Sequence, residues 1–393
     1  MSSPSSADTR TDALFAPAVD AALSTVRRNI PTFDRLYPAD TTDGGRYPLR
    51  PAHGAFAEGG NYGWTTSFWP GMQWLAYERS GDDAFRTAAL AHARDFDRRL
   101  RTGEDLDTHD IGFLYTLASV APWRLLGDED ARQTAIAAAD QLMTRFLEPA
   151  GIIQAWGDLA DPHQRGRTII DSLMNMPLLM WAYEQTGQER YVDAVRRHTE
   201  QLRVHIMRGD DSTFHTFYWD PVTGEPLRGA TEQGAHDDSC WARGQAWGIY
   251  GFAMAYRFTG DERMLDAAHR CARYFLAHLP ADAVPYWDLV YGDDSDAPRD
   301  SSAGAIAAAG LFELARVETD ADRAQQADAD ARRLLAALVA DCAPEPDTAD
   351  TLLLHGVYDL PKSNGVDEGN LWGDYFYFEA LTRATNPDWT PYW

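Results

Sequence analysis

The chain has 393 residues, of which 45% are hydrophobic, so it is long enough to bury a large core. Its formal net charge is -25 at pH 7, which argues against a nucleic acid or an anionic membrane as its partner, because most of its surface would repel either one. No stretch of the sequence is long and apolar enough to span a membrane, and three widely spaced cysteines fit neither a disulfide framework nor a metal site.

The beginning of the chain divides into two parts. Residues 1–10 are polar and lack the apolar core of a secretory signal, so we expect a disordered tail. Thr11–Arg28 is amphipathic and predicts a helix that begins a single catalytic domain, which we expect to run from residue 11 to residue 393. Without a signal, and with Cys240, Cys271 and Cys342 expected as reduced thiols, the protein is expected in the cytoplasm.

One phrase then recurs along the chain: an apolar helix, a short turn with glycine and aspartate, and a charge-rich amphipathic helix. Glycine favours the left-handed conformation that ends a helix, and aspartate caps the start of the next one. The amphipathic helices should face solvent, outside the apolar set. The turns begin at Ser80, Leu126, Thr186, Thr259 and, in a degraded form, Glu318.

The apolar helices are the inner members of this pattern. They are expected at Trp69–Tyr77, Asp110–Leu126, Asp171–Thr186, Trp241–Phe258, Ser301–Val317 and Leu371–Ala384. Five amphipathic helices follow the turns and the N-terminal helix supplies a sixth, so the pattern predicts an all-α fold, an (α/α)6 barrel that closes through both chain ends. An open helical-repeat array is the alternative, but its last helix would be a polar cap, whereas Trp372 and Phe376 look like core residues.

The barrel would gather chemistry at one mouth. All six inner helices run in one direction, so their N-terminal ends and the loops before them share that side. The long loops Gly209–Ser239 and Val284–Arg299, with their strand-like pieces, should form the walls of a cleft there. Helix N-termini carry partial positive charge, which favours a ligand with a carboxylate despite the net charge of the protein.

Two acids open neighbouring inner helices at this mouth: Asp110, which follows His109, and Asp171. Paired carboxylates suit acid/base chemistry on a glycosidic or enol ether bond. Aspartate is also a common N-cap, because its side chain accepts from the unpaired first-turn N–H groups, so a purely capping role is the competing interpretation of Asp171.

Aromatic side chains near the same mouth predict a cleft that stacks on sugars. Trp64 and Trp156 lie in polar loops, which favours a place in the site, whereas Trp241 and Trp247 lie at a helix start and also suit core packing.

Polar residues beside these tryptophans are candidates for binding a carboxylate or hydroxyl groups. Arg243 can form either a bidentate pair with a substrate carboxylate or a salt bridge with a loop acid. His215 and Gln233 lie in the long loop before the same helix, where they would equally suit bonds to loop backbone. His236-Asp237-Asp238 lacks a second acidic cluster at metal-binding spacing, so we expect no metal, and no cofactor.

Seven segments carry a resemblance to a known family. In chain order they read FWPGMQWLAYE, THDIGF, RTIIDSLMNMPLL, FHTFYWDPVTG, DDSCWARGQAWGIYG, DSSAGAIAAAGL and NLWGDYFYFEAL. With them the chain resembles glycoside hydrolase family 88, the unsaturated glucuronyl hydrolases, over nearly its whole length. The resemblance implies an exo-acting enzyme that removes a 4,5-unsaturated uronic acid from the non-reducing end of oligosaccharides left by polysaccharide lyases.

The resemblance also implies roles for particular residues. Asp171 would be the general acid/base and Asp110 its essential carboxylate partner. The positions that match the family's sugar site are His109, Trp64, Trp156, His215, Gln233, Trp241, Arg243 and Trp247. Some members of the family use a segment before the last helix to bind a sulfate. Here that segment offers Lys362 and Ser363 for a sulfate, whereas the negative charge of Asp359 would repel one.

In the family's mechanism the enzyme hydrates the C4=C5 vinyl ether of the unsaturated sugar. Protonated Asp171 would donate to C4 and then take a proton from the water that attacks C5, while Asp110 stabilises the cation. Arg243 or helix N-termini would hold the uronate. The apolar surroundings and the nearby carboxylate should raise the pKa of Asp171, so we expect activity to peak on the acid side of neutrality.

Three other functions are compatible with the same fold. An inverting glycosidase would use Asp110 and Asp171 as base and acid on a saturated glycoside, with the carboxyls about 6.5 to 9.5 Å apart. A polysaccharide lyase would want a cluster of Tyr, His and Arg at an open groove. A non-catalytic sugar-binding protein would keep the aromatic residues without two buried acids of different pKa. The sequence allows a monomer or a dimer.

Overall fold

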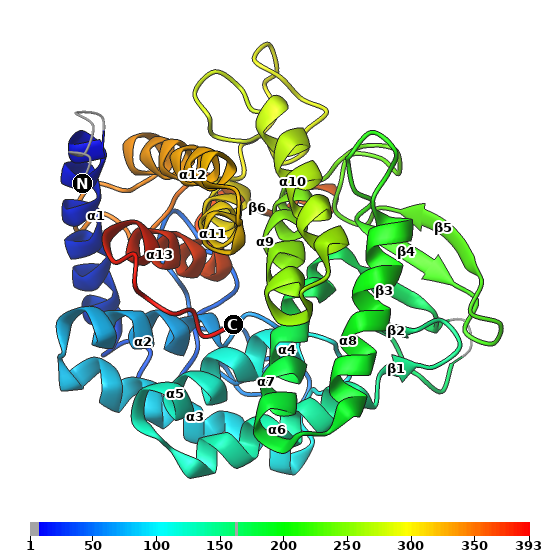
Figure 1. Ribbon diagram of the computed structural model, residues 1–393. Helices are drawn as coiled ribbons and strands as arrows, with labels where there is room; N and C mark the ends of the chain where they lie inside the picture. The colour runs from blue at the N-terminus through cyan, green and yellow to red at the C-terminus, as the bar shows by residue number, and fades with distance from the viewer. Residues whose placement is uncertain (1–7, 162–163) are drawn as a thin grey trace.

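The computed structural model describes residues 8–161 and 164–393, and its helices form an inner and an outer ring (Figure 1). Among the described residues, the inner ring consists of α2 (Phe68–Ser80), α4 with α5 (Ile111–Tyr115 and Ala121–Leu126), α7 (Met176–Thr186), α9 (Ala242–Thr259), α11 (Ser301–Val317) and α13 (Leu371–Thr385). The outer ring consists of α1 (Asp8–Asn29), α3 (Asp83–Thr102), α6 (Glu129–Met143), α8 (Glu189–Gln201), α10 (Glu262–Ala277) and α12 (Ala321–Asp341). The predicted (α/α)6 barrel is confirmed.

The two ends of the chain close both rings. The last inner helix, α13, packs against both α11 and α2, and α1 packs against α2, α12 and α13. In Figure 1 the blue N-terminal helix accordingly lies beside the orange and red C-terminal ones. The open array is therefore excluded. Helix α1 begins at Asp8, three residues before the predicted start at Thr11, and residues 1–7 of the expected tail lie outside the described residues.

The turns between inner and outer helices follow the sequence prediction. Gly81, Gly127, Gly187 and Gly260 end their helices with φ between 67° and 69°. This left-handed conformation is strained for residues with a Cβ, so the turn depends on glycine. The carboxylates that cap the next helices by accepting backbone N–H bonds belong to Asp82, Asp128, Asp261 and Asp320.

Two inner helices depart from regular α-helix near the mouth. A π-helical turn, Thr116–Val120, joins α4 to α5, and a 3₁₀ turn, Ile170–Asn175, precedes α7. Ile169 is the residue before that 3₁₀ turn, and no side chain caps it. The capping interpretation of Asp171 is therefore wrong: its carboxylate lies inside the turn and bonds no backbone N–H.

Short strands occupy the connections before the inner helices. β3 (Arg167–Ile169), β4 (Thr216–Trp219) and β5 (Pro226–Ala230) form an antiparallel sheet in that order. In the first pair Arg167 faces Tyr218 and Ile169 faces Thr216. The other strands make antiparallel pairs of β1 (Phe146–Leu147) with β2 (Ile152–Ile153) and of β6 (Gly356–Asp359) with β7 (Asn364–Glu368). None of the helices in residues 8–161 and 164–393 has the length and apolarity needed to cross a membrane.

The opposite end of the barrel is held by buried charges. Glu313 of α11 is fully buried and accepts from Arg257 Nη1 at 2.8 Å and from Arg383 Nη1 at 3.0 Å. Arg316 Nη2 donates to it at 2.9 Å as well. Burial by itself would raise the pKa of Glu313, but these three guanidinium groups hold it at about 2. The carboxylate is thus charged and paired at neutral and mildly acidic pH.

We expect Glu313→Gln to destabilise the barrel by about 3–5 kcal/mol at pH 7, because the change removes a buried carboxylate that pairs with three arginines, of which only Arg383 has a second side-chain carboxylate partner, Glu379, among the described residues. The contribution of Glu313 is complete above its ordinary pKa of 4.5 and is lost as the pH falls toward 2, because a lowered pKa stabilises only the ionised form. Urea unfolding at pH 7 and at pH 3 measures both effects. Glu129→Gln, in an exposed pair with Arg132, is the control and should leave the midpoint unchanged.

Candidate active site

A cavity of about 260 Å³ opens where the N-terminal ends of the inner helices meet. Of the twelve residues predicted for the site, only Ser363 is not among those that line it. The lining consists of Trp64, His109, Asp110, Ala155, Trp156, Ile169, Asp171, His215, Glu232, Gln233, Trp241, Arg243, Trp247, Tyr358 and Lys362. The sequence analysis missed Glu232 and Tyr358, which lie in loop and strand segments without a distinctive local pattern.

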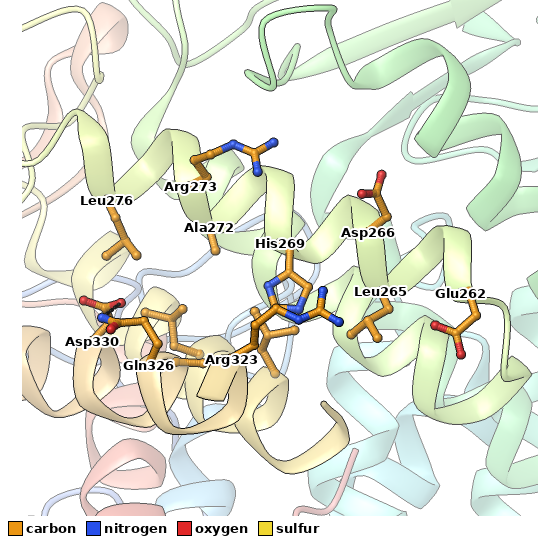
Figure 2. Close-up of a pocket in the computed structure, with 13 residues that line it drawn as sticks. Glu262, Leu265, Asp266, His269, Ala272, Arg273, Leu276, Arg323, Gln326 and Asp330 are labelled. Carbon is orange, nitrogen blue, oxygen red and sulfur yellow. Dashed lines mark hydrogen bonds between the residues drawn. The ribbon is translucent and has the colours of Figure 1, made fainter. Parts of the chain in front are cut away.

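A larger groove, of about 440 Å³, lies on the outer surface between α10 and α12 (Figure 2). Its ionisable groups are already paired: His269 Nε2 lies 2.5 Å from Glu318 Oε2, and Arg323 Nε lies 3.4 Å from the same oxygen. The sides of helices line this groove, and it contains no pair of adjacent unpartnered acids. We therefore place the chemistry in the smaller cavity.

His109 lies between the two acids. Its Nε2 is 3.4 Å from Asp110 Oδ1 and 3.6 Å from Asp171 Oδ1. One nitrogen of His109 and one carboxylate oxygen of each acid all lie within 4.8 Å of one another. The His109 backbone N–H donates to Ala155 O at 2.9 Å, and Thr108 Oγ1 donates to Asp110 Oδ2 at 2.6 Å. These bonds fix the segment that carries the first acid before α4 begins.

A separate set of bonds fixes the turn that carries Asp171. Ser172 Oγ donates to Ile169 O at 2.6 Å, and His198 Nε2 lies 2.8 Å from the same hydroxyl. His198 Nδ1 accepts from the Ile153 N–H at 3.0 Å, so its proton is on Nε2 and points to Ser172. Asp171 itself has no protein hydrogen bond to its buried Oδ1 among the described residues. Its carboxyl is held in place by the backbone and left free to act on a ligand.

The surroundings set different pKa values for the two acids. Burial, together with the charge of Asp110, raises the pKa of Asp171 well above its ordinary value, and Arg243 opposes this only in part. Burial raises the pKa of Asp110 to about 6, against the Thr108 hydrogen bond and the charge of Arg145. Two interacting acids release their protons in steps that belong to the pair, and both burial and the charge of Asp110 favour the protonated form of Asp171.

His109 does not take up that proton. Burial, followed by the charge of Arg145, lowers the pKa of His109 to about 3, so its imidazole is neutral. A metal ion at this cluster would need both carboxyls ionised, whereas the surroundings of Asp171 favour its protonated form; we assign no metal here. The arrangement is suited to give one proton to a bound ligand and to take it back.

Of the two interpretations of Arg243, the structure shows the salt bridge with a loop acid, Asp300. Its Nη1 donates to Asp300 Oδ2 at 3.0 Å and to Val357 O at 2.5 Å, and its Nη2 donates to Gln233 Oε1 at 3.1 Å and to Tyr358 O at 2.7 Å. The bidentate clamp on a substrate carboxylate is therefore not available, because all four Nη–H groups are taken within the protein.

The same guanidinium also organises the cavity wall. It is buried between the rings of Trp241 and Trp372, at 4.4 and 5.0 Å from their centroids. Its bonds to Val357 O and Tyr358 O tie the β6 strand to the start of α9. Arg243 thus joins distant parts of the wall and supplies one buried positive charge.

Two polar side chains keep a donor for a ligand. The Oε1 of Gln233 is used by Arg243, which leaves its amide nitrogen, and His215 Nδ1 accepts from the Glu232 N–H at 2.9 Å, which puts its proton on Nε2. Burial lowers the pKa of His215 to about 3, so this imidazole is a neutral donor. The ring of His215 packs on Trp241 at 4.5 Å.

The other aromatic residues form the walls and the floor. Trp156 carries the guanidinium of Arg167 on its ring at 4.7 Å. Trp64 Nε1 donates to Tyr358 Oη at 3.0 Å, so the two side chains form one wall. Trp247 is only 1% exposed and belongs mainly to the floor, as the core-packing interpretation expected.

The segment before the last helix reaches the cavity through Tyr358 and Lys362. Lys362 Nζ lies 2.7 Å from Asp359 Oδ2, and the lysine side chain is 67% exposed. Ser363 is exposed in a left-handed turn with φ of 52° and does not line the cavity. The carboxylate expected to oppose a sulfate is therefore paired with the lysine that would attract one.

Comparisons with known proteins show the family of the chain. The family model described as Glycosyl Hydrolase Family 88 matches residues 47–348. The unsaturated chondroitin disaccharide hydrolase of Streptococcus pyogenes serotype M1 is 44% identical over 96% of this chain and 92% of its own length. The unsaturated glucuronyl hydrolase of Bacillus sp. GL1 is 42% identical over 97% of this chain and 99% of its own length.

Solved structures are similar over the same extent. The crystal structure of the Bacillus sp. GL1 enzyme, described as responsible for the degradation of glycosaminoglycan, has a TM-score of 0.90 and covers 95% of this chain and 97% of its own. A variant of the Streptococcus agalactiae unsaturated glucuronyl hydrolase, complexed with dGlcA-GalNAc6S, is 40% identical with a TM-score of 0.83 and covers 96% of this chain and 93% of its own.

Proposed function

Since the chain belongs to glycosyl hydrolase family 88, we propose that it releases a 4,5-unsaturated uronic acid from the non-reducing end of oligosaccharides made by polysaccharide lyases. The observation that supports this function in the chain's own residues is the pair of acids, Asp110 and Asp171, on either side of His109, with no hydrogen bond to Asp171 Oδ1 among the described residues. A vinyl ether is hydrated by protonation at carbon, which needs an acid that stays protonated near neutral pH. Asp171 meets that need.

In the proposed reaction Asp171 gives its proton to C4 of the unsaturated ring, and positive charge develops at C5 and the ring oxygen. The ionised Asp110 stabilises this charge across the cavity. Water then attacks C5 and gives a proton to the Asp171 carboxylate, which restores the starting state. The hemiketal formed at C5 opens, and the rest of the oligosaccharide leaves as an alcohol.

We propose that neutral donors hold the uronate carboxylate. The His215 Nε2–H, the Gln233 amide and the partial positive charge at the start of α9 replace the bidentate arginine expected from the sequence. Arg243 then contributes through its charge and by holding Gln233. Trp156 and Trp64 supply the faces on which the sugar rings lie.

The geometry does not favour the alternative functions. An inverting glycosidase needs about 6.5 to 9.5 Å between its carboxyls to fit a water, whereas oxygens of Asp110 and Asp171 approach within 4.8 Å. A sugar-binding protein without catalysis gains nothing from a buried unpaired acid, which costs stability. A cytoplasmic location is also part of the proposal; the three buried free thiols favour it.

The test of this function follows the ultraviolet absorbance of the conjugated double bond in lyase-generated disaccharides. We expect the absorbance to decay when the protein is added, at the same rate with or without a chelator. The rate should rise through about pH 6 as Asp110 ionises and fall at higher pH as Asp171 loses its proton. A constant signal with chondroitin, hyaluronan, heparin, gellan and ulvan fragments, together with cleavage of a saturated glycoside, would contradict the proposal.

A further inference from the structure

Arg145 lies behind the cavity wall and has no role in the chemistry above. It follows α6 and is 1% exposed. Its Nη1 approaches Asp107 Oδ1 only to 4.0 Å, and that carboxylate is 97% exposed, so no buried acid neutralises the guanidinium at short range. Burying a charge without a close counter-charge costs folding free energy unless hydrogen bonds to the surrounding groups offset that cost.

Its hydrogen bonds hold the segment that presents Trp156. Nε donates to Gln154 O at 2.9 Å and Nη2 donates to Gly157 O at 3.0 Å, one bond on each side of the tryptophan. Gly157 has φ of 94°, a backbone conformation that residues with a Cβ rarely adopt, so this turn of the loop favours glycine. Arg145 therefore clamps both ends of the loop.

The same loop is joined to the first acid. The His109 N–H donates to Ala155 O at 2.9 Å, and Thr108 bridges to Trp156. Movement of the loop would consequently move the segment that carries Asp110. One arginine thus controls both an aromatic wall and the position of a carboxyl.

The charge of Arg145 acts unequally on the two acids. It opposes the rise in the pKa of Asp110 that burial causes, and it is not among the groups that shift the pKa of Asp171. The other groups that face or influence Asp110 are Thr108, His109, Asp171, Asp105, Arg99 and Tyr358. Among the charged ones, Arg145 favours the ionised form of Asp110 most strongly.

We propose that Arg145 is a positioning residue that clamps the Trp156 loop and supplies a buried positive charge beside the segment that carries Asp110. The proposal rests on the function given above, because only an enzyme that needs one charged and one protonated acid benefits from an unequal field. It assigns no contact between Arg145 and the substrate.

Two variants separate the charge from the clamp. In Arg145→Gln the charge is lost, so we expect the acid limb of the kcat/KM profile to move up by about one pH unit and KM to rise several-fold. In Arg145→Lys the charge remains but the two-sided clamp is lost, so KM should rise while the acid limb stays at its wild-type position. The control is Arg124→Gln, which removes an exposed arginine whose Nη1 also donates to a backbone carbonyl, Pro391 O. It should lower the melting temperature without changing the profile.

A measurement that does not need turnover accompanies these kinetics. The carboxyl carbon of Asp110 can be titrated by NMR in the wild type and in Arg145→Gln, and we expect a higher pKa in the variant. An unchanged pKa and acid limb in Arg145→Gln would overturn the proposal, as would equal shifts in the Lys and Gln variants or a wild-type KM in both. If the wild type converts no lyase product, the proposed function fails, and the NMR titration still decides the role of Arg145.

Discussion

Asp171→Asn is expected to lower the turnover of unsaturated disaccharides by about 10⁴-fold while the substrate still binds. Asparagine fills the same volume but has no proton to give to C4 and no carboxylate to accept one from water. Because Asp171 Oδ1 makes no hydrogen bond among the described residues, the change disturbs no structural contact of that atom. Loss of the ultraviolet decay, with binding measured by calorimetry, tests the expectation.

The same variant should also be more stable than the wild type above neutral pH. A carboxyl whose pKa is raised by folding binds its proton more tightly in the folded state, so its unfavourable effect grows as the pH rises from the ordinary pKa toward the raised one. The neutral amide removes that effect. Melting temperatures at pH 5 and pH 8 should therefore differ less for Asp171→Asn than for the wild type.

Asp193→Asn, on the exposed side of α8, is the control for both measurements. It should keep wild-type turnover and the wild-type dependence of melting temperature on pH. If Asp171→Asn retained more than about a tenth of the wild-type rate, Asp171 would not be the general acid. If it melted at a lower temperature than the wild type at pH 8, the carboxyl would be a structural group rather than a strained catalytic one.

Asp110→Asn is expected to reduce kcat by about 10²- to 10³-fold, because the developing positive charge loses the anion that faces it. Its more specific effect concerns the alkaline limb of the pH profile. The charge of Asp110 helps to raise the pKa of Asp171, so without that charge the limb should move to lower pH. A kcat profile from pH 4 to pH 9 measures both effects.

Asp107→Asn tests whether the loss of any nearby carboxylate lowers kcat and shifts the alkaline limb, as expected for Asp110→Asn. Asp107 lies three residues before Asp110, but its side chain is 97% exposed and screened by solvent. We expect wild-type kcat and an unshifted alkaline limb. Equal profiles for the wild type and Asp110→Asn would show that the two acids do not interact.

The double variant of Asp110 and Asp171 should be little slower than Asp171→Asn alone, because the effects of residues that act as a unit are not additive.

Much of the barrel could be predicted because its signals are local. The turn at Gly81 and Asp82 depends only on glycine's access to a left-handed conformation and on a carboxylate that reaches the next N–H groups. The apolar helices need burial whatever their partners are. The N-terminal helix is needed as the sixth outer helix and the last helix as the sixth inner one, so a closed barrel brings the two chain ends together, as α1 and α13 do.

For the candidate site, the position of the two acids could be predicted from the sequence, whereas the hydrogen-bond partners could not. Parallel inner helices bring their starts together, so the placement of Asp110 and Asp171 at helix starts was enough to predict one shared mouth. The partners of each side chain were not predictable. Arg243 bonds Val357 O and Tyr358 O, which lie 114 and 115 residues later in the chain. No local sequence pattern predicts that these two carbonyl groups accept from the Arg243 N–H groups that could otherwise bind a substrate.

The sequence by itself determined the ring of helices and the shared mouth, since periodicity, turn chemistry and helix starts are properties of neighbouring residues, and it placed Asp110 and Asp171 together at that mouth. Only the tertiary structure decided that Asp171 lies inside a 3₁₀ turn without a capping bond and that Arg243 is fully engaged by the protein. It also revealed Arg145 behind the Trp156 loop. Hydrogen-bond partners and the burial that shifts a pKa depend on groups far apart in the chain, and folding alone brings them together.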